Sequence, residues 1–512
     1  MIREVVSTLV SDAAGRFGKA PAFTVPGQET LTFVDVDDRA GRFAGGLAAI
    51  GIKAGDHVAL HLPNGWEWIV AYHAIARLGA VVVPANILLS PSEVSYMVAD
   101  SEAKAAIMPA DRRGAIDLAG GVSAITLGQA DDALPFDTLL DGRYTDPVLR
   151  DADDLFTIGY TSGTTGKPKG AMLSHAGLFA SLAATATIHV RHSADTVLSS
   201  LPFPHVYGNI VMNATFLTGA RLVTTPRFDP EVALRLIGEE QATLFEGVPT
   251  MYYQMLADPG IGAAKLSSLT RCTVGGQTMP TAKIDAVVER FGCPLLELWG
   301  MTEVAGPAVT HSPYWAPRPG SIGLPVPGLE ARIADLADPT RDAASGDSGE
   351  LMVRGKLVMQ GYWKNPQATA EVIDKDGWLA TGDIARQESD GYLFIVDRKK
   401  DLIITAGYNI YPAELEQVIA MHPAVAMVAV AGIADDEKGE LAHAFVVLHS
   451  GGRLDQAELL AHCRQHLAAY KVPRLITFVD DLPKSSTGKI LRRALRERSD
   501  RSAATNRPAV TA

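Results

Sequence analysis

Short apolar runs alternate with helix-length segments between the N-terminus and Pro325. Residues 58–62 and 80–83 have the apolar, β-branched composition of buried strands, and residues 66–78 between them have helical periodicity. The alternation predicts further strands at residues 105–108, 155–159, 197–201, 221–224, 243–245 and 295–298. Strands alternating with helices are typical of α/β folds with largely parallel sheets, and one doubly wound sheet or two would fit this pattern.

The pattern changes beyond Gly328. Short strands and the turn dipeptides Asp376-Gly377 and Asp390-Gly391 predict an antiparallel β-rich subdomain. A smaller α+β unit follows Asp397, with predicted strands at 426–431 and 444–448 and a predicted helix at 454–467. We therefore expect an N-terminal domain over residues 1–397, a mobile C-terminal domain over 398–497 and a disordered tail at 498–512.

Composition restricts the class of protein. The 512 residues carry a net charge of −12, and 47% are hydrophobic, which fits a globular enzyme and argues against a nucleic-acid partner. The three cysteines show neither ligand nor redox spacing, which is typical of a reducing compartment. Apolar runs such as 424–433 are too short to span a membrane, and no signal peptide is apparent at the N-terminus. We expect a cytoplasmic protein, and a homodimer is compatible with the sequence.

Residues 160–170 combine three glycines, four Ser or Thr hydroxyls and two lysines. Glycines let consecutive N–H groups approach an anion closely, and the hydroxyls and lysines add donors and charge. The segment follows an apolar run and precedes a helical pattern, so we interpret it as a strand-to-helix loop that cradles phosphate. It is no ordinary P-loop, because only two residues separate Gly163 from Gly166 and Pro168 follows Lys167.

Two further segments offer groups for a nucleotide. Trp299 presents a face for adenine, Thr302 a hydroxyl for a phosphate oxygen and Glu303 a hard oxygen ligand for Mg²⁺. Asp383 follows a glycine and is suited to accept both hydroxyls of a ribose. Read alone, these residues could equally be a buried tryptophan, a surface acid and a turn residue.

Three more positions have chemical potential. His205 lies at a strand end, where ligands of open α/β sheets gather, and could contact a carboxylate or be a structural histidine. Gly275 and Gly276 leave backbone bare for a planar group, or form a tight turn. Lys489 lies on a glycine-flanked loop able to enter a cleft, although its composition also suits an ordinary tail lysine.

The order and spacing of six such motifs, spanning residues 160–489, resemble the adenylate-forming superfamily, which includes acyl-CoA synthetases, firefly luciferase and the adenylation domains of peptide synthetases. The resemblance implies an AMP-forming ligase that uses ATP, Mg²⁺ and CoA, and whose small domain rotates between two half-reactions. The chain departs from the family at Gln277-Thr278-Met279, where Ala-Pro-Leu is common, and at Trp299, where Tyr is usual. Ile404 stands where luciferases have an additional lysine, which disfavours oxygenase activity.

The resemblance also implies residue roles. The catalytic residues would be Lys489, His205, Thr302 and Glu303, with Glu303 as the Mg²⁺ ligand. ATP or AMP would be bound by Thr161, Ser162, Gly163, Thr164, Thr165, Gly166, Lys167, Lys169, Gly276, Gln277, Trp299, Gly300, Thr302, Asp383 and Arg398. Lys400 would be the hinge, Gly407 and Tyr408 would face CoA, and His205, Tyr207 and Gly275 would line the acyl pocket.

Several functions remain open at this stage. The first is a ligase that joins a medium- or long-chain fatty acid, or a similar apolar or aryl acid, to CoA. The second is an adenylation enzyme that loads a separate carrier protein, and the third a nucleotide-binding regulator without turnover. A dicarboxylate such as malonate would need an extra basic group, for which His205 or Arg271 could serve. The identity of the acid depends on side chains distant in sequence.

Overall fold

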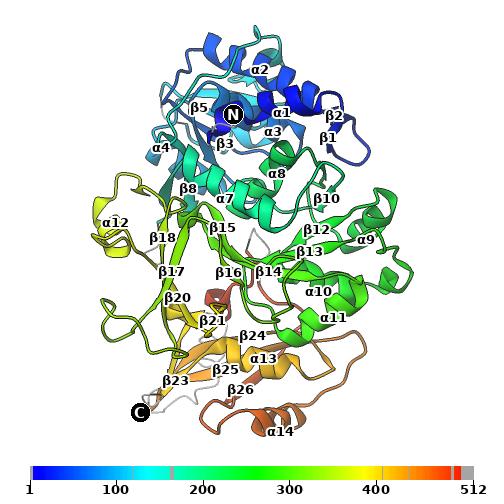
Figure 1. Ribbon diagram of the computed structural model, residues 1–512, viewed down its shortest axis with the longest axis vertical. Helices are drawn as coiled ribbons and strands as arrows, with labels where there is room; N and C mark the ends of the chain where they lie inside the picture. The colour runs from blue at the N-terminus through cyan, green and yellow to red at the C-terminus, as the bar shows by residue number, and fades with distance from the viewer. Residues whose placement is uncertain are drawn as a thin grey trace, which may run out of the picture.

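The computed structural model describes residues 4–118, 120–161, 167–405, 408–435, 437–485 and 489–496. Within them, two large sheets and a four-stranded sheet build the N-terminal part, and a five-stranded sheet builds the C-terminal part (Figure 1). The fold-class prediction is therefore confirmed: a large α/β unit with a β-rich subdomain precedes a smaller α+β unit. The exact domain limits and the mobility of the C-terminal unit stay predictions.

The nine-stranded sheet is parallel at its centre and antiparallel at both edges. In spatial order its strands are β16 (Leu324–Pro325), β15 (Gly306–Thr310), β14 (Leu295–Met301), β13 (Arg271–Gly275), β12 (Leu244–Gly247), β10 (Thr196–Ser199), β11 (Arg221–Val223), β1 (Pro21–Thr24) and β2 (Thr30–Thr32). The helices that connect or flank them are α8 (Val206–Thr218), α9 (Pro230–Glu239), α10 (Pro249–Ala257), the 3₁₀ turn η2 (Pro259–Ala263) and α11 (Thr281–Phe291).

The eight-stranded sheet is parallel from β8 to β7. Its order is β19 (Gly361–Tyr362), β9 (Lys169–Ser174), β8 (Leu155–Thr161), β4 (Val81–Pro84), β3 (His57–Leu60), β5 (Ala105–Pro109), β6 (Ser123–Leu127) and β7 (Leu134–Pro135). The helical segments of this half are η1 (Val6–Thr8), α1 (Leu9–Phe17), α2 (Phe33–Ala49), α3 (Trp66–Arg77), α4 (Pro91–Asp100), α5 (Ala110–Arg113), α6 (Phe136–Leu140) and α7 (His175–Ile188).

The helices begin where the sequence provides caps. Thr32 and Ser90 each form a capping box, with Asp35 and Glu93 respectively, and Ser174 caps α7. Helix α7 is apolar on all sides and buried, and it contacts β9 of one large sheet and β15 of the other. The main hydrophobic core is therefore shared by both large sheets and the helix packed between them.

The phosphate-loop segment departs from the prediction. Thr161 at the end of β8 pairs with Lys169 at the start of β9, and the two strands run antiparallel. The loop between them thus joins two strands of one sheet, and the interpretation as a strand-to-helix loop was wrong. Helix α7 begins only after β9, so the favourable dipole of a helix N-terminus does not act at this loop.

The remaining units cover one end of the N-terminal sheets. The four-stranded antiparallel sheet comprises β17 (Leu329–Ala334), β18 (Gly349–Gly355), β20 (Leu379–Gln387) and β21 (Leu393–Arg398), accompanied by α12 (Pro366–Val372) and η4 (Lys399–Asp401). The 3₁₀ turn η3 (Thr302–Val304) instead connects β14 to β15 and contacts both large sheets. The C-terminal sheet comprises β23 (Tyr408–Ile410), β22 (Ile403–Thr405), β25 (Gly439–Leu448), β24 (Val425–Asp435) and β26 (Leu475–Phe478), covered by α13 (Pro412–Ala420) and α14 (Gln456–His466). Among the described residues, no helix combines the length and apolarity needed to cross a membrane.

Candidate active site

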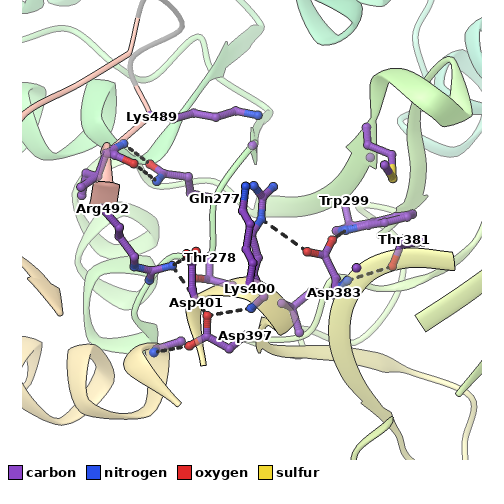
Figure 2. Close-up of a pocket in the computed structure, with 18 of the residues that line it drawn as sticks. Gln277, Thr278, Trp299, Thr381, Asp383, Asp397, Lys400, Asp401, Lys489 and Arg492 are labelled. Carbon is purple, nitrogen blue, oxygen red and sulfur yellow. Dashed lines mark hydrogen bonds and ion pairs between the residues drawn. The ribbon is translucent and has the colours of Figure 1, made fainter. Parts of the chain in front are cut away.

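A cavity of about 2050 Å³ lies where the N-terminal sheets, the four-stranded sheet and the C-terminal unit meet. Gly276 and Trp299 line it from the carboxyl ends of β13 and β14, and Asp383 and Arg398 line it from β20 and β21. Lys489 reaches it from the last described segment of the chain (Figure 2). The cavity thus occupies the edge of the sheet where ligands of open α/β folds bind.

Lys489 is partly buried in this cavity. Loss of hydration and, to a smaller extent, the positive charge of Arg398 lower the pKa of its ammonium group to about 8. The carboxylates of Asp383 and Glu303 act in the opposite direction. At neutral pH the side chain is still mostly charged, so it can stabilise negative charge that develops nearby.

Gly276 lies directly beside the catalytic-lysine candidate. Its φ of +93° belongs to the left-handed region, and a Cβ there would lie 3.0 Å from Lys489 Cε. The neighbouring Gln277 does not present a free amide to a nucleotide, as the sequence suggested. Its Nε2 donates to the carbonyl of Ile490 (3.3 Å) and its Oε1 accepts from the Ile490 N–H (3.0 Å), contacts that no local sequence pattern indicates.

Trp299, Asp383 and Arg398 form a connected group in the cavity wall, and Figure 2 shows Trp299 and Asp383 across from Lys489. The indole Nε1–H of Trp299 donates to Asp383 Oδ2 (2.7 Å), and Arg398 Nε lies 3.4 Å from Asp383 Oδ1. Asp383 and Trp299 are buried, whereas Arg398 is half exposed. The tryptophan therefore does more than offer a stacking face: its N–H supplies a hydrogen bond that fixes the Asp383 carboxylate.

A second polar group surrounds Glu303. Its Oε1 accepts hydrogen bonds from the Tyr362 hydroxyl (3.0 Å) and from Thr161 Oγ1 (3.4 Å). Burial, followed by the negative charge of Glu303, raises the pKa of Tyr362, so this hydroxyl remains a donor. No local pattern in the sequence indicates Tyr362, because it lies 59 residues beyond Glu303 and its contact depends on β19 pairing with β9.

Thr302 and Gly300 take positions next to this group. The Thr302 side chain packs against Gly159, where a Cβ would lie 2.6 Å from its Cγ2. Gly300 lines the cavity, and a Cβ there would overlap the backbone of Gly306 on the adjacent strand. Close packing around the site therefore requires glycine at both Gly159 and Gly300.

The two lysines of the phosphate-loop motif face different surroundings. Lys169 lines the large cavity, and its Nζ lies 5.2 Å from the centre of the Tyr362 ring. Lys167 is exposed, lies over the ring of Tyr96 at 6.0 Å and is not among the residues that line the cavity. The remaining predicted loop residues, Ser162, Gly163, Thr164, Thr165 and Gly166, lie outside the described residues, as does Gly407.

Glu303 fits a Mg²⁺ ion that arrives with a nucleotide. Among the described residues there is no cluster of three or more carboxylate, His or Cys side chains that could hold a metal alone. Mg²⁺ usually keeps several waters and binds one or two carboxylates together with substrate phosphates. A single buried carboxylate that accepts from Thr161, in a cavity also lined by Lys169, is compatible with such a shared site.

His205 precedes α8 and caps it. The Tyr207 N–H donates to His205 Nδ1 (3.3 Å), so the neutral ring carries its proton on Nε2. Burial, followed by the charge of Lys489, lowers the pKa of His205 to about 3. The ring is therefore neutral at physiological pH and can donate one hydrogen bond from Nε2, but it supplies no positive charge.

A second, smaller cavity of about 60 Å³ begins at His205 and Thr302, which line both cavities. Its wall also contains Tyr72, Val206 and Asn209, which sequence reasoning did not single out. The Tyr72 hydroxyl donates to Asn209 Oδ1 (2.9 Å) inside this wall. The small cavity thus continues from the large one towards the buried helices α3 and α8.

Two residues predicted to line the acyl pocket do not line either cavity. The Tyr207 ring is buried in the core and its hydroxyl pairs with Thr273 Oγ1. Gly275 is the last residue of β13, where Leu298 of β14 covers the space that a side chain would take. At both positions the residue packs against an adjacent strand and does not face a cavity. The prediction that Tyr207 and Gly275 line the acyl pocket is therefore corrected.

The proposed hinge residue and the described CoA-side residue differ in their relation to the cavity. Lys400 is an exposed residue of η4 that lines the cavity. Tyr408 is exposed on β23, where its ring lies 4.9 Å from that of Tyr470, and it lines neither cavity. The structure therefore places Lys489, rather than Tyr408, in the cavity.

Arg271 is not available as an extra basic group. Its guanidinium is buried at the start of β13, the opposite end from the cavity, where it pairs with Asp195 (2.6 Å) and donates to the carbonyl of His189 (2.7 Å). Arg271 is already paired with Asp195 and the ring of His205 is neutral. Neither residue can therefore supply the positive charge that a second carboxylate of a dicarboxylate substrate would need.

Comparison with known proteins agrees with this geometry. The model of the AMP-binding enzyme family matches residues 10–363, and that of the AMP-binding enzyme C-terminal domain matches residues 414–489. A long-chain-fatty-acid–CoA ligase of Bacillus subtilis (strain 168) is 35% identical, over 96% of this chain and 94% of the relative. A feruloyl-CoA synthase of an Amycolatopsis species is 38% identical, over 92% of this chain and 94% of the relative.

The solved structure of ATP-bound MatB from Rhodopseudomonas palustris has a TM-score of 0.89 with this chain and 31% sequence identity, covering 96% of this chain and 98% of that one. The match extends over both units of the fold and therefore includes the cavity between them. The chain belongs to the AMP-binding enzyme family and is an acid–thiol ligase of the acyl-CoA synthetase type.

Proposed function

We propose that this protein activates a compact apolar or aryl carboxylic acid with ATP, releases pyrophosphate, and transfers the acyl group from acyl-AMP to CoA. The observation that carries the proposal is that Lys489, Thr302 and His205 all line one cavity. A nucleotide phosphate beside Lys489 and Thr302 would lie next to a carboxylate bound at His205. An acid and the α-phosphorus of ATP would thus meet at this point.

In the first half-reaction an oxygen of the carboxylate attacks the α-phosphorus and pyrophosphate leaves. His205 would orient the carboxylate by donating from Nε2, and Lys489 would stabilise the charge that develops on the phosphate oxygens. Mg²⁺, held by Glu303 and the phosphates, would supply further charge neutralisation. Asp383, fixed by Trp299, would accept the ribose hydroxyls.

In the second half-reaction the CoA thiolate attacks the acyl carbonyl and AMP leaves. Tyr408 lies outside the cavity in this arrangement, whereas Lys489 lies inside it. We therefore propose that the C-terminal unit rotates about Lys400 between the half-reactions. The rotation would withdraw Lys489 from the cavity and bring the face of the unit that carries Tyr408 to the acyl-AMP.

The small cavity supports a compact acid. Its volume of about 60 Å³ would have to increase through movement of side chains before a long chain could enter. The Tyr72–Asn209 hydrogen bond stabilises its wall in the present position. A dicarboxylate is not supported, because Arg271 is paired with Asp195 and the ring of His205 is neutral.

The test is to incubate the purified protein with ATP, Mg²⁺, CoA and a pool of aryl, short-chain and long-chain acids, and to identify CoA thioesters by mass spectrometry. We expect AMP, pyrophosphate and one or more thioesters of compact acids. Formation of long-chain thioesters alone would refute the acid class. Release of ADP would refute the reaction itself.

A further inference from the structure

The side-chain amide of Gln277 joins the N-terminal sheets to the segment that carries Lys489. Gln277 follows β13 at the carboxyl end of the sheet, and its amide makes two hydrogen bonds with the backbone of Ile490, the residue after Lys489. Figure 2 shows Gln277 next to Lys489. An amide that both donates to and accepts from one residue behaves like the peptide of a neighbouring strand. It fixes the position and the direction of the backbone it contacts.

Backbone hydrogen bonds join Lys489 and Leu491 to residues that precede them in the C-terminal part. The Ser485 N–H donates to the Lys489 carbonyl (2.7 Å), and the Leu491 N–H donates to the Pro483 carbonyl (2.8 Å). These bonds do not fix the position of Lys489 relative to the N-terminal sheets. The Gln277 pair provides that position.

The neighbouring residue, Gly276, leaves little tolerance for a shift of Lys489. Gly276 leaves room for the aliphatic part of the Lys489 side chain, which a Cβ would approach to 3.0 Å. A shift of the segment by a fraction of an ångström would move the ammonium group relative to Asp383 and Glu303. A defined anchor at Ile490 therefore bears directly on where the charge of Lys489 lies.

We infer that Gln277 is a positioning residue that holds Lys489 at the nucleotide during adenylate formation and releases it for thioester formation. The inference rests on the proposed function for the order of the half-reactions. Its chemical basis is that glutamine supplies the donor and the acceptor together, whereas glutamate would lose the donor and alanine or methionine would lose both. Because the contact joins two parts of the fold, it must break when the C-terminal unit turns.

Other contacts between the two parts provide a matched control. Lys283 Nζ on α11 donates to the carbonyl of Val425 (2.6 Å), and the Thr281 N–H donates to Gln417 Oε1 (2.9 Å). Neither contact touches the segment with Lys489. Lys283→Met therefore weakens the same interface without removing the anchor at Ile490.

The first test needs no knowledge of the acid. The rate at which an amine-reactive acetylating reagent labels Lys489 is measured against pH by peptide mass spectrometry, for wild type, Gln277→Ala, Gln277→Met and Lys283→Met. The groups facing the ammonium are Arg398, Asp383, Glu303 and His205. We expect a labelling midpoint near 8 in wild type and in Lys283→Met, and a clear rise towards 10.5, the ordinary lysine value, in both Gln277 variants.

The second test separates the half-reactions. With an acid that the enzyme accepts, exchange of radiolabelled pyrophosphate into ATP reports adenylate formation, and supplied acyl-AMP with CoA reports thioester formation. Loss of two neutral hydrogen bonds predicts a decrease in exchange of about five- to 150-fold in Gln277→Ala and Gln277→Met. Thioester formation from acyl-AMP should be unchanged, as should the KM for ATP.

Three results would overturn the inference. They are an unchanged labelling midpoint in both Gln277 variants, an equal decrease of both half-reactions, and a raised KM for ATP with normal labelling, which would make Gln277 a nucleotide contact. Thermal unfolding shows whether the variants fold. We expect Gln277→Ala to fold, because alanine is common at this position in the adenylate-forming superfamily. If no acid is ever accepted, the proposed function fails while the labelling result still decides the role of Gln277.

Discussion

The charge of Lys489 gives a quantitative prediction for the pH dependence of adenylate formation. Burial and the charge of Arg398 lower the pKa of this lysine to about 8. With that value about 90% of the side chains are protonated at pH 7 and about 10% at pH 9. If the charged form stabilises the transition state, pyrophosphate exchange should fall roughly ten-fold between pH 7 and pH 9.

The sign of the effect distinguishes this lysine from other groups. Protonation is required, so the rate is highest below the pKa and is lost as the pH rises through about 8. His205 does not contribute to this change, because its pKa of about 3 leaves it neutral throughout. Thioester formation from supplied acyl-AMP should instead rise over the same range, because the thiol of CoA loses its proton.

The assay is pyrophosphate exchange from pH 6.5 to 9.5 at ATP and acid concentrations well below their KM values, so that the profile reports the pKa of the unliganded enzyme, with Lys489→Arg as the control. Arginine keeps its charge over this range, so the variant should have a lower rate but a flat profile. A wild-type rate that stays constant up to pH 9.5 would refute the argument. So would a decrease of the same size in Lys489→Arg.

Further predictions concern the groups around this lysine. Trp299→Phe should raise the KM for ATP and lower the free energy of unfolding by about 1–3 kcal/mol, because the buried Asp383 carboxylate loses a donor; ATP titration and urea denaturation measure both effects, and an unchanged KM would contradict them. Gly276→Ala should reduce pyrophosphate exchange at least as much as loss of the Gln277 amide, through strain at positive φ and contact with Lys489, and normal exchange would show that the segment can shift freely. Burial raises the pKa of Glu297 to about 8, so the native state keeps a proton that the unfolded chain releases above pH 4.5, and stability is lost as the pH rises from 4.5 to 8. Glu297→Gln should remove this loss, so its melting temperature should exceed that of wild type at pH 8.5 by more than at pH 5.

The fold was predictable where burial determines the pattern. Parallel strands covered on both faces are apolar throughout, so the prediction of strands at 58–62 and 105–108 agrees closely with β3 and β5. The connection after β8 was not predictable in the same way. β9 contains Lys169 and Gly170, and its extended form comes from pairing with β8 rather than from local preference.

The site was predictable where a motif places its residues on one strand or loop. Thr302 and Glu303 follow β14 directly and reach the cavity together. Partners that are distant in sequence were not predictable, because no local periodicity records them. The bond from Tyr362 to Glu303 spans 59 residues and that from Gln277 to Ile490 spans 213.

Tyr207 illustrates a different difficulty. It follows His205 by two residues at the start of a helix, so one side chain faces the cavity while the other faces the core. The sequence allows either orientation, and the hydrogen bond to Thr273 on β13 decides it. Residues of an apolar helix can therefore be assigned to a pocket only once the adjacent strands are known.

The central claim is that Lys489 serves one half-reaction and is absent from the other, within one active site. The most direct measurement compares Lys489→Ala with wild type in pyrophosphate exchange and in thioester formation from supplied acyl-AMP. We expect the loss of a charged group at the reacting phosphate to reduce exchange by at least about 10²- to 10³-fold, with thioester formation near the wild-type rate. Equal loss of both activities would contradict the claim.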